Sequence, residues 1–204
     1  MVTPNFIFWE VDMQRDFVLP GGNLYVPGAE KLLPKIRQLT DAARQGKVFL
    51  VSSGDFHAPN DPEFKIFPPH CLKGEPGSEL VAEAIMGKVA RVENSDAAKL
   101  PADLSQYQQI LLEKQTLDVF QTRHASALVD RLGKEPEFVV FGVVTEYCVN
   151  CAVKGLLQRG RRVAVVTDAI ETLKQEEGEK TVSEWKRLGA RLTTTDQALN
   201  ALAG

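Results

Sequence analysis

Short apolar runs alternate with longer stretches of helical spacing along this chain. The runs have the length of buried strands, and in the stretches between them apolar residues recur every three or four positions. Such alternation predicts a mainly parallel sheet with helices on both faces, so we expect an α/β fold, a three-layer α/β/α sandwich. The predicted strands are residues 6–11, 47–53, 109–113, 138–144, 162–167 and 191–194.

Glycines mark the expected ends of several helices. Gly46, Gly133 and Gly160 each follow a helical stretch, where the left-handed backbone of a helix end favours glycine. Residues 54–77 have no regular period and are rich in proline, and a loop this long in a compact domain is usually functional. One predicted helix ends near residue 45. Others cover residues 78–86, 126–132, 147–159 and 177–188, and a short helix lies at the end of the chain.

Composition narrows the class of protein. Of the 204 residues, 44% are hydrophobic and 25% charged, which argues against a disordered, collagen-like or coiled-coil chain. At about 150 residues per domain, the length favours a single domain over residues 1–204. The net charge of -3 leaves no basic excess, so we expect no nucleic-acid partner.

The N-terminal segment and the cysteines indicate where in the cell the protein is located. The segment is apolar but has no cationic start and soon reaches Glu10 and Asp12, so it predicts neither a signal peptide nor a membrane span. Three cysteines, an odd number, argue against a secreted disulfide framework. We therefore expect a cytoplasmic protein with no membrane partner, and a homo-oligomer remains open.

Chemically distinctive residues stand where predicted strands end: Asp12, Asp55 and His57, Lys114, and Cys148. The carboxyl ends of parallel strands share one edge, where ligands bind, so we expect these side chains to meet. Taken singly, Asp12 could be a turn residue, Lys114 a surface lysine and Cys148 a small buried hydrophobe. Together they predict a nucleophilic thiol at the start of a helix, whose thiolate form the helix dipole and Lys114 favour.

Cys148 and Cys151 also form a Cys-Val-Asn-Cys pair, a spacing found in thiol-redox proteins. The pair lacks the proline or glycine usual between such cysteines, and it shares its sheet edge with residues that a redox pair does not need. We therefore expect Cys151 to pack in the core and keep a redox protein as an alternative.

Four metal-type ligands lie within residues 55–70: Asp55, His57, Glu63 and His70. Carboxylates and imidazoles form a mixed oxygen and nitrogen site, which suits Zn, Fe or Mn and is poor for calcium. The simpler alternative is that each histidine is only hydrogen-bonded, and we assign that role to His124. In a chain with three histidines, the clustering of two beside two carboxylates favours a metal.

Three segments are distinctive as motifs: Gly-Asp-Phe-His at Gly54, Phe-Pro-Pro-His-Cys-Leu-Lys-Gly at Phe67 and Gly-Val-Val-Thr-Glu-Tyr-Cys-Val at Gly142. They resemble the nicotinamidases of the isochorismatase-like cysteine hydrolase superfamily. The similarity extends from Asp-Met-Gln-Arg-Asp-Phe at Asp12 to Thr-Asp-Ala at Thr167. The resemblance implies the isochorismatase-like hydrolase fold, a small-molecule amide substrate, and conversion of nicotinamide to nicotinate and ammonia.

The resemblance also implies roles for single residues. Asp12, Lys114 and Cys148 would form the catalytic triad, in which Asp12 moves the thiol proton and Cys148 forms a thioester. The oxyanion would lie on the backbone N–H groups of Val144 and Cys148, with a cis peptide between Val143 and Val144.

A second set of implied roles concerns metal and substrate. Asp55, His57 and His70, with Glu63 as a fourth ligand, would hold one divalent ion, Zn first and Fe or Mn as alternatives. Waters would complete its shell, one of them replaceable by the pyridine nitrogen. Phe17 and Phe67 occupy positions where the family packs aromatic side chains on the ring.

Two departures from the family pattern bear on the substrate. Glu146 stands where Asp is usual in the family. Leu117 and Asp118 alter the segment that follows Lys114, and we expect this segment to form a pocket wall. The alternatives are therefore a sibling cysteine hydrolase acting on another small amide, a non-catalytic metal-binding module, or the Cys-x-x-Cys redox protein.

Overall fold

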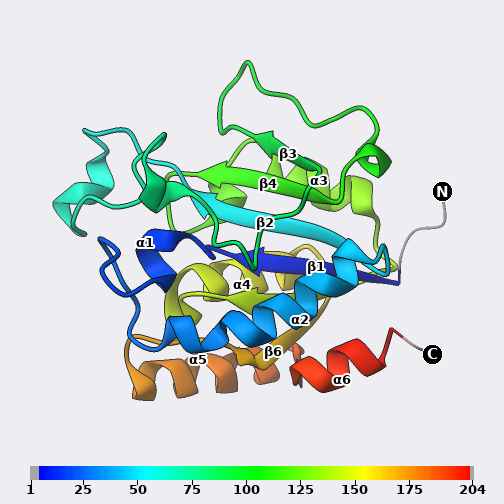
Figure 1. Ribbon diagram of the computed structural model, residues 1–204. Coiled ribbons are helices and arrows are strands. Elements are labelled where there is room, and N and C mark those ends of the chain that lie inside the picture. Colours follow the sequence, from blue (N-terminus) through cyan, green and yellow to red (C-terminus); the bar gives the residue numbers. More distant parts are fainter. Residues whose placement is uncertain (1–4, 203–204) are drawn as a thin grey trace.

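A computed structural model describes residues 5–202, in which seven strands form one parallel sheet (Figure 1). The strand order is β3-β4-β2-β1-β5-β6-β7, with every neighbouring pair parallel. This confirms the predicted α/β class. The strands are β1 (Phe6–Val11), β2 (Phe49–Asp55), β3 (Val89–Val92), β4 (Gln109–Lys114), β5 (Glu137–Gly142), β6 (Arg162–Ile170) and β7 (Arg191–Thr193).

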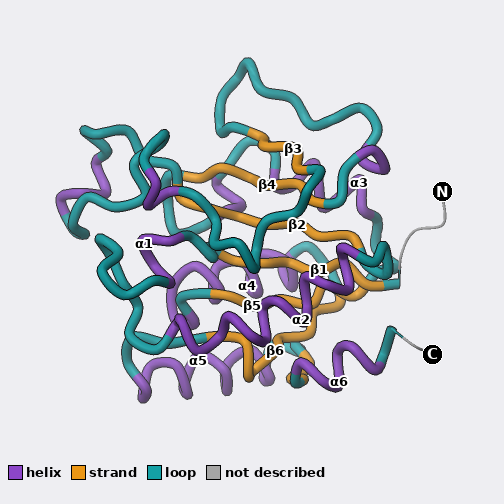
Figure 2. Tube along the Cα trace, viewed as in Figure 1, coloured by secondary structure: helices purple, strands orange, loops and turns teal. Residues whose placement is uncertain are grey.

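Helices cover both faces of the sheet (Figure 2). They pack there because alternate residues of a strand point to opposite faces: Phe8 of β1 contacts one apolar cluster, and Ile7 and Trp9 contact the other. The first cluster includes α1, α2 and α6, and the second includes α3, α4 and α5. The helices are α1 (Arg15–Val18), α2 (Leu33–Arg44), α3 (Ala125–Leu132), α4 (Asn150–Gln158), α5 (Gln175–Arg187) and α6 (Thr195–Asn200).

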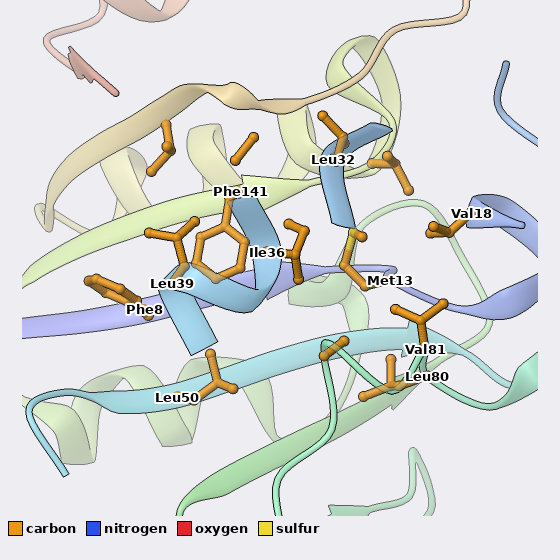
Figure 3. Close-up of a cluster of buried hydrophobic side chains, with 14 of the residues drawn as sticks. Phe8, Met13, Val18, Leu32, Ile36, Leu39, Leu50, Leu80, Val81 and Phe141 are labelled. Atoms are coloured by element: carbon orange, nitrogen blue, oxygen red, sulfur yellow. The ribbon is translucent and has the colours of Figure 1, made fainter. Parts of the chain in front are cut away.

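The cluster beneath α2 illustrates how the sheet and helix are joined (Figure 3). Ile36 and Leu39, on the inner side of α2, are fully buried against Phe8 of β1 and Phe141 of β5. Full burial of each such side chain stabilises the fold by about 1.5 to 3 kcal/mol. The predicted end of this helix is also confirmed, since Gly46 has a φ of 72° just beyond it.

The prediction of a helix over residues 78–86 is wrong. Leu80, Val81 and Ala84 are buried, as the apolar pattern requires, but the backbone around Leu80 pairs with the segment around Gln14. The Arg15 N–H donates to the Glu79 carbonyl at 3.0 Å, and the Val81 N–H donates to the Met13 carbonyl at 2.9 Å. Tertiary pairing therefore supplies the hydrogen bonds that a helix would have made internally.

Other boundaries shift in ways that matter for the site. The predicted strand 138–144 ends earlier, at Gly142, and the next residues form an irregular connection. The predicted helix 147–159 is α4, preceded by a single wide turn over Thr145–Val149, in which the Val149 N–H donates to the Val144 carbonyl. Strand β3, with four residues at the sheet edge, was not predicted. No helix within residues 5–202 is long and apolar enough to cross a bilayer.

One buried acid lies in the middle of β1. Glu10 is fully buried, and neither carboxyl oxygen has a hydrogen-bond partner among the described residues. Burial raises the pKa of Glu10 well above its usual range, because the charged form is poorly solvated there. Folding therefore favours the protonated acid, and the native state loses stability as pH rises above the unfolded pKa of about 4.3.

Glu10→Gln cannot ionise. We therefore expect its free energy of unfolding, relative to that of the wild type, to increase as the pH rises from 4 to 8. The gain should grow by about 1.4 kcal/mol for each pH unit between the unfolded and the folded pKa of Glu10, because only the wild type has a carboxyl that folding must keep protonated. Urea unfolding at both pH values measures it, with exposed Glu135→Gln as the matched control. A difference that stays constant with pH would show that Glu10 titrates normally.

Candidate active site

The candidate site lies at the carboxyl ends of four adjacent strands, in the order β4-β2-β1-β5. Lys114 is the last residue of β4, Asp55 is the last of β2, and Asp12 follows β1. Cys148 lies in the turn after β5. Asp55 of β2 and Lys114 of β4 lie opposite each other in the pairing of these two strands, so the sheet itself places the charged groups side by side.

Lys114 is at the centre of this group and is completely buried. Its Nζ lies 2.9 Å from Asp12 Oδ2, 2.5 Å from Asp55 Oδ1 and 3.5 Å from Cys148 Sγ. Burial alone would lower the pKa of Lys114, but the two carboxylates outweigh it and raise that pKa well above its usual range. The ammonium therefore stays charged and is paired on two sides, as a buried cation must be.

The thiol is neutral in this arrangement. Burial, and next the Asp12 carboxylate, raise the pKa of Cys148 well above its usual range, although Lys114 acts in the opposite direction. Lys114 thus favours the thiolate, as expected, but desolvation of the thiolate is the larger effect and the net shift of the Cys148 pKa is upward. Burial also raises the pKa of Asp12, to about 6, against the pull of Lys114. A buried thiol thus stands beside a carboxyl group that is a base at neutral pH.

Asp55 links the lysine to a second cluster. Burial would raise its pKa, but Lys114 and the nearby His57 and His70 rings outweigh burial and hold the pKa of Asp55 below its usual range. One oxygen, Oδ1, contacts Lys114. The other, Oδ2, lies 3.9 Å from His57 Nε2 and 3.8 Å from His70 Nε2. One carboxylate therefore serves both halves of the site.

The second cluster has the composition of a metal site. Asp55, His57, Glu63 and His70 each offer a ligand atom, and these atoms all lie within 4.8 Å of one another. His57 is fully buried, and neither of its ring nitrogens has a hydrogen-bond partner among residues 5–202; Nε2, which faces Asp55, is thus free to ligate a cation. Two carboxylates and two imidazoles suit zinc, iron or manganese. The third histidine, His124, lies elsewhere, with its ring 3.4 Å from the Ser95 carbonyl.

Backbone pairing brings the two histidines together across the long loop. The His57 N–H donates to the Cys71 carbonyl at 3.0 Å, and the Lys73 N–H donates to the His57 carbonyl at 2.9 Å. The Cys71 N–H in turn donates to Asp16 Oδ2 at 2.7 Å. These bonds join the segment after β2 to the segment that carries His70.

Sequence reasoning overlooked three residues that position this cluster: Gln14, Asp16 and Asp61. The Gln14 side chain bonds both backbone groups of Asp55, accepting from its N–H at 2.6 Å and donating to its carbonyl at 2.5 Å. Asp16 holds Cys71, as described above, and Asp61 Oδ2 lies 3.0 Å from His57 Nδ1. Gln14 and Asp16 belong to the motif at Asp12, so the motif was the available signal, whereas Asp61 had none.

A cavity of about 60 Å³ opens between the two clusters. Phe17 and Phe67 line it, as the substrate-binding prediction requires, and Cys148 lies on the same surface as the metal-type ligands Glu63 and His70. The remaining lining is mostly apolar and consists of Leu24, Tyr25, Val26, Asp55, Leu117, Val144, Tyr147 and Leu173. The cavity therefore connects the thiol with the metal-type cluster.

Comparison with known proteins places this arrangement in a family. Residues 8–86 and 86–197 match the family model described as Isochorismatase domain. The chain belongs to the isochorismatase family. It is a nicotinamidase-like member, and its enzyme class is that of hydrolases acting on C–N amide bonds.

Individual isochorismatase-family proteins resemble the chain over nearly its full length. The nicotinamidase of Escherichia coli strain K12 is 25% identical over 206 residues, covering 90% of this chain and 92% of that protein. The structure of a pyrazinamidase of Pyrococcus horikoshii in complex with zinc has a TM-score of 0.75 and 26% identity, with coverage of 94% and 99%. An isochorismatase-like hydrolase from Alkaliphilus metalliredigens shares the fold, with a TM-score of 0.78, 22% identity and coverage of 96% and 98%.

Two features that the family resemblance implied can be located. The peptide bond between Val143 and Val144 is cis, as expected. Val144 and Cys148 both line the cavity, and the oxyanion role of their N–H groups stays a prediction.

The departures from the isochorismatase-family pattern have different consequences. Leu117 forms part of the cavity wall, as expected, but Asp118 does not, because its carboxylate accepts from the Phe120 N–H at 2.9 Å. Glu146 does not line the cavity either. Its carboxylate accepts from the backbone N–H groups of Leu173 and Lys174, both at 3.0 Å, and thereby fixes the rim residue Leu173.

Proposed function

We propose that the protein is a metal-dependent amidohydrolase, a nicotinamidase that converts nicotinamide to nicotinate and ammonia through a thioester on Cys148. One observation carries this proposal: the buried Cys148 thiol and three of the four cluster residues, Asp55, Glu63 and His70, line the same small cavity, and Asp55 is shared between Lys114 and the cluster. A ring bound between the two would present its carboxamide to the sulfur, which is the orientation that amide attack requires.

The chemistry follows from the protonation states. Because the raised pKa keeps Cys148 protonated, its proton must leave as Sγ attacks the amide carbon, and Asp12 is the base in position to accept it. Asp12 would return that proton to the departing ammonia as the C–N bond breaks, leaving the acyl group on sulfur. A water, deprotonated by Asp12, would then hydrolyse the thioester to the acid and restore the thiol.

Lys114 and two backbone groups would stabilise charge during these steps. The Lys114 ammonium lies between Asp12 and Cys148, so it keeps compensating negative charge as the proton moves from one to the other. The N–H groups of Val144 and Cys148 would donate hydrogen bonds to the oxyanion of the tetrahedral intermediate. Fixed donors of this kind are worth about 2.7 to 4 kcal/mol each in measured cases.

Asp55, His57, Glu63 and His70 would hold one divalent ion, for which zinc is our proposal. The oxygen and nitrogen donors support it, as does the zinc named for the Pyrococcus horikoshii pyrazinamidase. When bound, the ion would supply a Lewis acid that holds the ring nitrogen. Phe17 and Phe67 would pack against the ring and exclude water.

The cavity favours a neutral aromatic amide. No lysine or arginine of the described residues lines it, and Lys114 is already paired with Asp12 and Asp55. A carboxylate-bearing substrate such as a ureido acid or isochorismate would therefore find no lysine or arginine among the lining residues to pair with its charge. Leu117 in the wall supports the second candidate, a sibling hydrolase that acts on another small neutral amide.

Three free cysteines support a reducing environment, and we propose a cytoplasmic enzyme.

Ammonia release from nicotinamide, pyrazinamide, a ureido acid and isochorismate, with zinc supplied, tests the proposal. We expect kcat/KM to be highest for the two aromatic amides. Removing the metal with a chelator should lower kcat/KM at least about tenfold, because the ring loses its anchor, and added zinc should restore it. No turnover of any amide by the zinc-loaded protein would refute the amidohydrolase, and a profile unchanged by the chelator would remove the metal from the mechanism.

A further inference from the structure

Asp61 makes two contacts that converge on the metal-type cluster. Its Oδ2 lies 3.0 Å from His57 Nδ1, on the side of the ring away from the cluster. Its Oδ1 accepts a hydrogen bond of 2.9 Å from the Glu63 N–H. A single carboxylate thus touches the ring of one candidate ligand and the backbone of another.

Asp61 is itself held in place by short turns. Its N–H donates to the Ala58 carbonyl, and its own carbonyl accepts from the Phe64 N–H, both at 3.1 Å. It caps the short helical turn Pro62–Lys65, and its side chain is only 10% exposed. The carboxylate is therefore pre-organised before any ligand arrives.

We propose that Asp61 is a positioning residue for the metal, one that directs His57 Nε2 toward the ion and holds the turn that presents Glu63. An imidazole has one protonated nitrogen when neutral, and a carboxylate beside Nδ1 places that proton there, leaving the Nε2 lone pair for a cation. The inference rests on the metal-dependent function proposed above. It adds a residue that contacts neither substrate nor ion and acts through two ligands.

Capping alone does not explain this arrangement. Asp103 and Asp118 cap short turns in the same way, accepting from the Ser105 and Phe120 N–H groups at 2.9 Å. Within residues 5–202, neither of these two carboxylates contacts a histidine. The second contact, to the His57 ring, is what distinguishes Asp61, and Asp103 provides a matched control.

Zinc affinity of the full-length protein, measured by competition with a fluorescent chelator, tests the role of Asp61. Asp61→Asn keeps an oxygen that can cap the turn but loses the second carboxylate oxygen, so we expect zinc to bind about 10-fold to 100-fold more weakly. Asp103→Asn should bind zinc as tightly as the wild type. Circular dichroism of each variant checks that the fold is retained.

A measurement on the wild type keeps the test independent of how the variants fold. Nitrogen NMR shifts of the zinc-loaded protein should show His57 protonated on Nδ1, and protonation on Nε2 would overturn the inference. Equal zinc affinity in folded Asp61→Asn and the wild type would overturn it as well. Failure of the wild type to bind zinc would instead refute the metal in the proposed function, so the two failures are distinguishable.

Discussion

Replacing Cys148 by Ser should abolish amide hydrolysis, with kcat lowered about 10⁴-fold or more. The reason is the chemistry of the nucleophile. A hydroxyl is a much weaker acid than a thiol, and Asp12, whose pKa is about 6, is too weak a base to activate it in the buried site. Steady-state ammonia release measures the loss, and mass spectrometry of the wild type under rapid quench should detect the acyl group on Cys148.

Cys151→Ser is the matched control. Cys151 lies one helical turn further on and is only half-buried, so the expectation that it packs in the core is wrong. It has no place in the proposed reaction, and this variant should retain most of the activity. Equal loss in the two variants would contradict the thioester mechanism and revive the Cys-x-x-Cys redox alternative. Full activity in Cys148→Ser would contradict the nucleophile itself.

Replacing Asp12 by Asn should lower kcat/KM about 10²-fold to 10⁴-fold and remove the acid limb of the pH profile. Burial raises the pKa of Asp12 to about 6, so below this pH the group carries a proton and cannot accept one from Cys148. In the wild type, kcat/KM should therefore rise with pH to a plateau, with a midpoint near 6. The Asn variant has no carboxylate at this position and should lack that limb.

The pH profile is measured with zinc at saturation, so that loss of metal does not imitate loss of the base. Asp196→Asn, at a side chain that is 79% exposed, controls for the change of charge and should keep the limb near pH 6. A midpoint near the ordinary aspartate value of about 3.9 would contradict the raised pKa. A limb near 6 that persists in Asp12→Asn would assign it to another group.

Strand prediction succeeded where burial makes the local pattern unambiguous. In β1 and β5, at the centre of the sheet, nearly every residue is buried, and the continuous apolar runs identify them. Residues 78–86 show the opposite case, since an irregular segment can bury the same apolar positions as a helix when another part of the chain satisfies its backbone. Strand β3 is too short, and too exposed at the sheet edge, for its pattern to be distinctive.

Site prediction succeeded for residues whose chemistry is unusual at a strand end. Asp12, Asp55, Lys114 and Cys148 are such residues, and a parallel sheet directs the ends of its strands to one edge. Gln14, Asp16 and Asp61 act through backbone and ring contacts, which leave no mark of their own in composition or spacing. The single domain over residues 1–204 stays a prediction.

The amino-acid sequence by itself determined the α/β class and which side chains gather at the carboxyl edge, because alternation of apolar runs and position after a strand are local properties. Only the tertiary structure decided the strand order that sets β4, β2, β1 and β5 side by side, and with it the burial of the charged groups. Burial raises the pKa of both Cys148 and Asp12, and for the thiol it outweighs the effect of Lys114 that the sequence predicted. Desolvation depends on every atom around a group, and most of those atoms come from residues distant in the chain.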